Sequence, residues 1–97
     1  MTLNVLVDTG YDGPLTLPPP AVAALGLPLR RVRRVEVADG SLVEVPVHEA
    51  RVIWDGAERT VMVRALGTQP LLGMGLLAGH RLCVDAVDGG AVTIETL

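Results

Sequence analysis

The chain has 97 residues, a net charge of −3 at pH 7 and a single cysteine, Cys83. This length is typical of one domain, residues 1–97, and the negative charge with only 2% aromatic residues argues against nucleic-acid binding. One cysteine excludes an intrachain disulfide and a cysteine-based metal site. No apolar run is long enough to span a membrane and no signal-peptide pattern begins the chain, so we expect no membrane partner and a cytoplasmic location.

The first third of the chain predicts a strand, a second extended piece and a short helix. The apolar run Leu3–Val7 is typical of a short buried strand, and Pro14–Leu17 follows a turn-rich stretch as another extended segment. Three consecutive prolines can open a helix, so we expect one over Ala21–Leu25, where a glycine and a proline then end it.

The remainder of the chain predicts three hairpins and one more helical turn. Asp39-Gly40 is a strong signal for a two-residue turn, Pro46 indicates a sheet edge or a bulge, and a short helix is expected over Met74–Ala78. The strands of the hairpins are expected at Leu29–Val37 with Leu42–Val45, Glu49–Trp54 with Glu58–Ala65, and Leu82–Val87 with Ala91–Thr96. Hairpins at such short spacing, in a chain rich in Val and Leu, predict an all-β barrel or sandwich.

The most informative stretch is Asp8-Thr9-Gly10, which ends the first predicted strand. The strand delivers a carboxylate to its end, beside a glycine that lets other backbone approach closely. Asp and Gly are also ordinary turn residues, so the tripeptide alone favours a simple turn. A second segment near the other end, Leu71-Leu72-Gly73 before Met74–Ala78, makes the joint pattern more specific.

With both segments in view, the chain resembles the retropepsin-like (clan AA) aspartic proteases, particularly the small single-domain bacterial members. The resemblance runs from Leu3 to about Glu95 and implies a closed all-β barrel with one or two short helices. It also implies a flap hairpin over Val35–Val45 and half of a two-fold active site. Family members carry another hairpin before the Asp-Thr-Gly strand, so either that hairpin is missing here or the natural start lies upstream.

The resemblance implies an aspartic endopeptidase that uses two carboxylates sharing one proton to activate a water molecule. Because the chain has one Asp-Thr-Gly, two copies must meet as a homodimer, with a peptide or protein as substrate and no metal or other cofactor. The implied catalytic residues are Asp8 as the acid and base, Thr9 as a brace between the two halves, and Gly10. The implied substrate-binding residues are Tyr11, Asp12, Asp39 and Gly40, and Gly73 would allow close packing beneath the loop.

Several of these residues have a simpler interpretation. Asp12, Asp39 and Gly40 are equally typical of plain turns. The four arginines between Arg30 and Arg34 are interpreted as a solvated strand edge. His48 and His80 are interpreted as satisfied or surface residues, Cys83 as a small buried hydrophobe, and Trp54 as a residue that packs against a hairpin, with a wall of the substrate pocket as the alternative. The alternative function is a non-catalytic β-barrel module of the same fold that serves binding or dimerisation.

Overall fold

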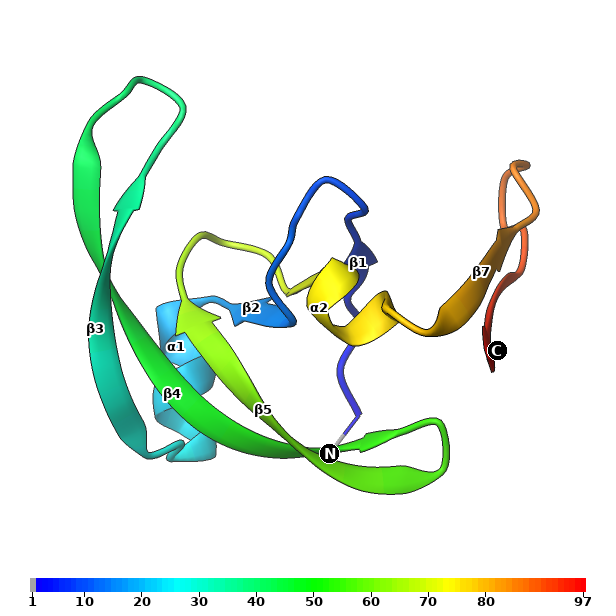
Figure 1. Cartoon of the computed structure of the whole chain (residues 1–97), viewed down its shortest axis with the longest axis horizontal. Helices are drawn as coiled ribbons and strands as arrows, with labels where there is room; N and C mark the ends of the chain where they lie inside the picture. The colour runs from blue at the N-terminus through cyan, green and yellow to red at the C-terminus, as the bar shows by residue number, and fades with distance from the viewer. Residues whose placement is uncertain (1) are drawn as a thin grey trace.

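The computed structural model describes residues 2–97, which form a strand-rich fold with two short helices (Figure 1). The strands are β1 (Leu6–Val7), β2 (Leu15–Leu17), β3 (Leu29–Glu36), β4 (Leu42–Trp54), β5 (Ala57–Ala65), β6 (Leu71–Leu72), β7 (His80–Val84) and β8 (Val92–Thr96), and the helices are α1 (Pro19–Leu25) and α2 (Met74–Leu77). Both predicted helices and all three hairpins are present. The first strand is only two residues long, with Leu6 exposed rather than buried, and the strands predicted at Leu42–Val45 and Glu49–Trp54 form one strand, β4.

The strands form a mixed six-stranded sheet in the order β1-β6-β2-β5-β4-β3 and a separate hairpin of β7 with β8. The predicted closed barrel is wrong, because the terminal strands β1 and β3 do not pair within residues 2–97. Closure needs a continuous ladder around the sheet. Here β1 supplies only two paired residues, and β3 pairs with β4 only from Leu42 to His48. The result is an open, strongly curved sheet (Figure 1).

Two turns of the main sheet show how the sequence determines strand pairing. Between β4 and β5, Asp55 and Gly56 both have positive φ, 51° and 78°, as a type I′ hairpin turn requires. Between β3 and β4, the N–H of Val37 donates to the carbonyl of Ser41 at 2.9 Å, which leaves a three-residue connection. The predicted two-residue turn at Asp39-Gly40 is therefore wrong in length. Gly40, with φ of 84°, occupies the left-handed position that ends such a connection.

Pro46 lies within β4, opposite Val32 of β3, and the ladder with β5 begins one residue later at Val47. The even-numbered residues of β4, Pro46 among them, direct their backbone groups toward β5 rather than toward β3. Because the ladder with β5 begins only after Pro46, the N–H that proline lacks costs no ladder hydrogen bond. The predicted edge position is thus confirmed on the β5 side. This arrangement lets one 13-residue strand join both halves of the sheet.

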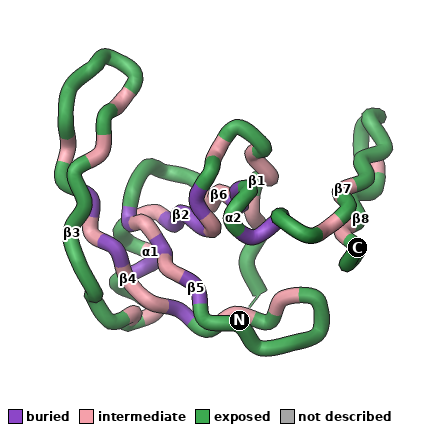
Figure 2. Tube along the Cα trace, in the orientation of Figure 1, coloured by how far each residue is buried: buried purple, intermediate pink, exposed green. Residues whose placement is uncertain are grey.

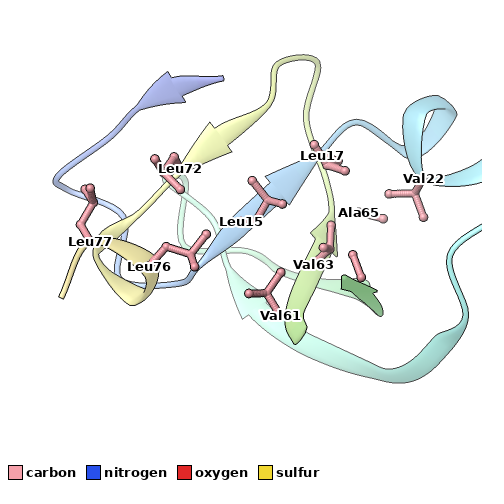
Figure 3. Close-up of a cluster of buried hydrophobic side chains, with 10 residues drawn as sticks. Leu15, Leu17, Val22, Val61, Val63, Ala65, Leu72, Leu76 and Leu77 are labelled. Atoms are coloured by element: carbon pink, nitrogen blue, oxygen red, sulfur yellow. The ribbon is translucent and has the colours of Figure 1, made fainter. Parts of the chain in front are cut away.

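The hydrophobic core lies between β2, β4, β5, β6 and the two helices (Figures 2 and 3). Leu17, Val63 and Leu76 are at most 1% exposed, and Val22 and Leu77 attach the helices to the same cluster. The core contains aliphatic side chains only, as the composition predicts. In residues 2–97 no helix is long and apolar enough to cross a membrane.

Candidate active site at the Asp8 loop

The Asp8 loop, residues 8–14, leaves β1 beside the end of β6. Parallel pairing aligns Leu6 with Leu71 and Val7 with Leu72, and the N–H of Asp8 continues this ladder by donating to the Leu72 carbonyl at 2.8 Å. The N–H of Tyr11 then donates to the Asp8 carbonyl at 3.2 Å, which turns the chain back. The Asp8 backbone is therefore fixed on both sides, as the sequence predicts for a residue at a strand end.

A second set of backbone hydrogen bonds ties the loop to the start of α2. The N–H of Met74 donates to the Tyr11 carbonyl at 2.7 Å, and the N–H of Gly75 donates to the Gly13 carbonyl at 3.1 Å. The N–H of Gly73 donates to the Pro14 carbonyl at 3.1 Å. Three consecutive N–H groups thus hold the loop from beneath.

Gly73 and Gly75 are small because the loop lies directly against them. A Cβ on Gly73 would collide with the carbonyl oxygen of Gly13 and the ring of Tyr11. A Cβ on Gly75 would lie 2.7 Å from the backbone nitrogen of Pro14, closer than real contacts allow. The predicted close packing at Gly73 is confirmed, and Gly75 is a second such position that the sequence analysis missed.

The side chain of Asp8 is half-buried, while Thr9, Gly10 and Asp12 are exposed. Asp8 Oδ1 accepts a hydrogen bond from the N–H of Gly10 at 2.9 Å, and among residues 2–97 this is the only hydrogen bond of its carboxylate. The arrangement is the Asx turn that an Asp-Thr-Gly sequence favours. It leaves the second oxygen accessible to water or to another chain.

Tyr11 supports the loop more than it faces solvent. Its half-buried hydroxyl donates to the Leu15 carbonyl at 3.5 Å, and the guanidinium carbon of Arg64 lies 5.4 Å from its ring centre. Arg64 reaches it because β2 and β5 pair with Thr16 opposite Arg64. The sequence analysis missed Arg64, because only the parallel pairing of distant strands brings this cation to the loop.

Asp39 and Gly40 lie at the tip of the β3–β4 hairpin, where both are exposed, and Figure 1 shows this tip standing apart from the Asp8 loop. Asp39 Oδ1 accepts hydrogen bonds from the Ser41 hydroxyl at 2.6 Å and from the Ser41 N–H at 2.9 Å. These bonds, the hydroxyl first, hold the pKa of the Asp39 carboxyl below its ordinary value of 3.8. The chain therefore does not place its own hairpin tip on Asp8.

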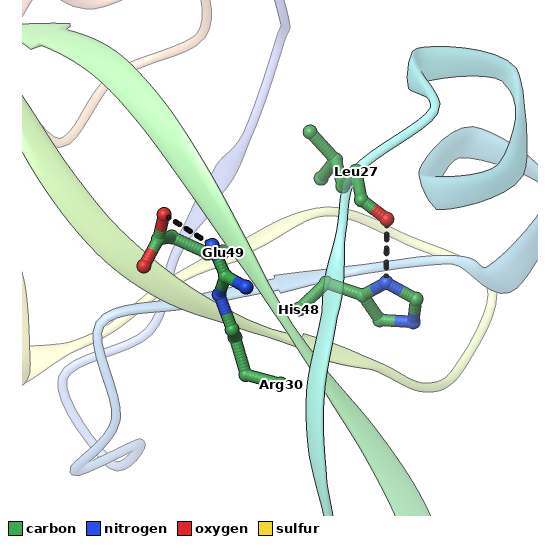
Figure 4. A network of polar contacts seen from close by, with 4 residues as sticks. All are labelled: Leu27, Arg30, His48 and Glu49. Atoms are coloured by element: carbon green, nitrogen blue, oxygen red, sulfur yellow. Dashed lines mark hydrogen bonds and ion pairs between the residues drawn. The ribbon is translucent and has the colours of Figure 1, made fainter.

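His48 and Arg30 have structural partners. His48 Nδ1 donates to the Leu27 carbonyl at 2.9 Å and Arg30 pairs with Glu49 at 3.1 Å, which together join β4 to the start of β3 (Figure 4). The interpretation of His48 as a satisfied residue is confirmed. Cys83 is exposed on β7, so its interpretation as a buried hydrophobe is wrong: it lies on the solvent face of the hairpin with Arg81, Thr93 and Glu95, while Leu82 and Ile94 occupy the other face.

Trp54 and His80 join the β7–β8 hairpin to the main sheet. Their rings meet edge to face with centres 5.4 Å apart, and Thr96 donates a hydrogen bond to the neighbouring Asp55. The interpretation of Trp54 as a residue that packs against a hairpin is confirmed, and Trp54 also lines a cavity that the Asp8 loop does not reach. Across residues 2–97, no group of three or more His, Cys, Asp or Glu side chains is arranged to hold a metal ion.

Comparisons of this chain with protein-family models, with curated proteins and with solved structures returned no match.

Proposed function

We propose that this protein is one half of an aspartic endopeptidase, in which two copies bring their Asp8 carboxylates together. The observation that carries the proposal is the support beneath the Asp8 loop. The N–H groups of three consecutive residues, Gly73, Met74 and Gly75, bind the loop carbonyls, and two of these residues admit no side chain. A plain surface turn needs no such support, whereas a catalytic carboxylate has to be held in place.

The partly accessible carboxylate suits the proposed chemistry. When two such groups lie about 3 Å apart they cannot both ionise, so they share one proton. The ionised carboxylate takes a proton from water as the water oxygen attacks the peptide carbonyl carbon. The protonated carboxyl donates its proton to the carbonyl oxygen, which gives a tetrahedral diol. The C–N bond then breaks as the other carboxyl protonates the nitrogen, and a hydroxyl of the diol returns its proton to the dyad, so that the acid, the amine and the singly protonated dyad result. Thr9, exposed beside Asp8, is proposed to brace the second copy.

The substrate in this proposal is a peptide or an unfolded protein, with Tyr11, Asp12, Asp39 and Gly40 as its contacts. The hairpin tip stands apart from the Asp8 loop of its own chain (Figure 1). For Asp39 and Gly40 to cover a substrate bound at Asp8, this hairpin has to bend toward the Asp8 loop, or the hairpin of the second copy has to cover it. No metal or organic cofactor is part of the proposed reaction.

The test is cleavage of an unfolded protein across about pH 3 to 7, with wild type beside Asp8→Asn and Asp88→Asn, the latter changing an exposed carboxylate between β7 and β8. Asn keeps the shape of the Asp8 side chain but cannot share a proton. The proposal expects cleavage by wild type and by Asp88→Asn, and none by Asp8→Asn. Equal activity of wild type and Asp8→Asn, or no activity in any of them, would count against it.

A second candidate is a non-catalytic binding or dimerisation module. One observation favours it: the hydrogen bond of the Asp8 carboxylate, from Gly10 at 2.9 Å, is the one that any turn of this sequence makes. A stable monomer at micromolar concentration, or a dimer whose cross-links avoid the Asp8 loop, would support the module. We also propose a cytoplasmic location, since the exposed thiol of Cys83 stays free in a reducing compartment.

A further inference from the structure

A cavity of about 670 Å³ lies on the side of the sheet that faces the N-terminal segment, and none of the Asp8 loop residues line it. All five residues from Ala50 to Trp54 of β4 line it, together with Thr2, Leu3 and Val5. The rest of the lining consists of leucines from β2, β6, α1, α2 and the loop after α1. We name this cavity the edge groove.

The edge groove runs along an edge of β4 as well as over one of its faces. Successive side chains of a strand point to opposite faces of the sheet. Ala50, Val52 and Trp54 share one face of β4, and Arg51 and Ile53, which lie between them, line the cavity as well. The cavity therefore follows the β4 backbone through all five residues.

This part of β4 has a strand partner on one side only. Residues 50–54 pair with β5, whereas the ladder with β3 ends at His48. One residue further, the N–H of Glu49 still reaches across and donates to the Pro28 carbonyl at 3.0 Å. Backbone groups of an antiparallel strand alternate between its two sides. The N–H and C=O of Arg51 and Ile53 therefore point to the side of Pro28, where within residues 2–97 they have no ladder partner.

Two exposed edges of the main sheet, those of β3 and of β4, differ in character. The edge of β3 carries four arginines between residues 30 and 34, a common protection against unwanted strand pairing. The edge of β4 beside the groove carries one arginine, Arg51, and Ile53, which is 75% exposed. An apolar edge with unpaired backbone groups is a template for another strand.

We infer that the edge groove binds an extended segment of another polypeptide, which adds to β4 as a strand beside residues 50–54. The unpaired donors and acceptors of Arg51 and Ile53 repeat at about 6.8 Å along the edge, which matches the repeat of an extended chain. Alternate side chains of that segment enter the apolar groove, so the partner carries Val, Ile or Leu at every second position. This inference is independent of the proposed protease activity.

The probe is a synthetic octapeptide, Lys-Val-Thr-Val-Thr-Val-Thr-Lys, acetylated and amidated at its ends. Trp54 is the only tryptophan and lines the groove, so its fluorescence reports occupancy. Two further peptides carry N-methyl groups on all valines or on all threonines. Because only one of these sets directs its N–H groups at β4, we expect saturable binding of the parent and loss of at least about tenfold in affinity for one N-methylated peptide. A loss of affinity for both N-methylated peptides, or for neither of them, would contradict strand addition.

The matching protein variants are Ile53→Pro and Ile53→Val. Proline removes the outward N–H of residue 53 without removing a bond to β5, whereas valine keeps it. We expect Ile53→Pro to lose peptide binding and Ile53→Val to keep it, with circular dichroism as the check on folding. If Ile53→Pro does not fold, the N-methylated peptides on the unchanged protein decide the question.

Three results would overturn the inference. The first is no saturable fluorescence change up to about 1 mM peptide. The second is saturable binding of sodium decanoate but not of the peptide, which would make the groove a site for small apolar molecules. The third is a dimer of the protein itself that Ile53→Pro dissociates and that takes up no peptide.

Discussion

The N–H of Met74 donates to the carbonyl oxygen of Tyr11 at 2.7 Å, across 63 positions of sequence. This bond joins the start of α2 to the middle of the Asp8 loop, and the flanking bonds from Gly73 and Gly75 join the same two segments. The two segments that carry the sequence resemblance are therefore in direct contact. Their contact explains why both are needed: one presents a carboxylate and the other fixes the loop that bears it.

Gly73→Ala should destabilise the protein by about 1–3 kcal/mol, the usual cost of forcing extra volume into a packed site. The added methyl group would collide with the Gly13 carbonyl and the Tyr11 ring, so the Asp8 loop has to move. Urea unfolding followed by far-UV circular dichroism measures the effect. The exposed loop variant Thr68→Ala is the control and should change stability by less than about 0.5 kcal/mol. Equal stability of the two variants would contradict the packing described for the loop.

Leu17→Ala should cost about 2–5 kcal/mol of stability, since Leu17 is 1% exposed in the centre of the core. The matched variant Leu42→Ala removes the same atoms from a side chain that is 59% exposed, and should cost far less. Both are measured by chemical unfolding under the same conditions. A similar loss in both variants would mean that the core lies elsewhere.

The pH dependence of the hairpin tip follows from Asp39 and Ser41. Because the Ser41 hydroxyl holds the pKa of the folded Asp39 carboxyl below 3.8, this contact stabilises the tip above that pH. The stabilisation is lost as the pH falls through the lowered pKa. An NMR titration of the Asp39 side chain should show the lowered value in wild type, and Ser41→Ala should return it toward 3.8. An unchanged titration in Ser41→Ala would show that the serine is not the cause.

The order of elements could be predicted because turn residues and apolar runs act locally. Asp55-Gly56 adopts the positive φ angles of a tight hairpin, and Gly26, with φ of 64°, ends α1 as expected. The barrel could not be predicted in this way. Closure depends on whether β1 and β3, which are distant in sequence, pair with each other, and no local pattern encodes that.

In the candidate site, too, local features could be predicted from the sequence and features that depend on long-range strand pairing could not. The position of Asp8 at a strand end follows from a local pattern of apolar and turn residues. The cation at Arg64 and the groove beside Ile53 arise from strand register and from an unpaired edge, which only the assembled sheet reveals. Cys83 was misjudged for the related reason that alternation predicts two faces of a strand but not whether another layer covers them.

The most direct test of the central claim is a mixing experiment between wild type and Asp8→Asn. If activity needs one Asp8 from each of two copies, a heterodimer is inactive. Equal amounts, left to exchange subunits, should then retain about a quarter of the activity of the same total concentration of wild type. The control replaces Asp8→Asn with Asp88→Asn, which changes an exposed carboxylate between β7 and β8 and should leave activity near the wild-type value. Retention of about half of the activity in the Asp8→Asn mixture would show that each chain acts alone and would contradict the shared dyad.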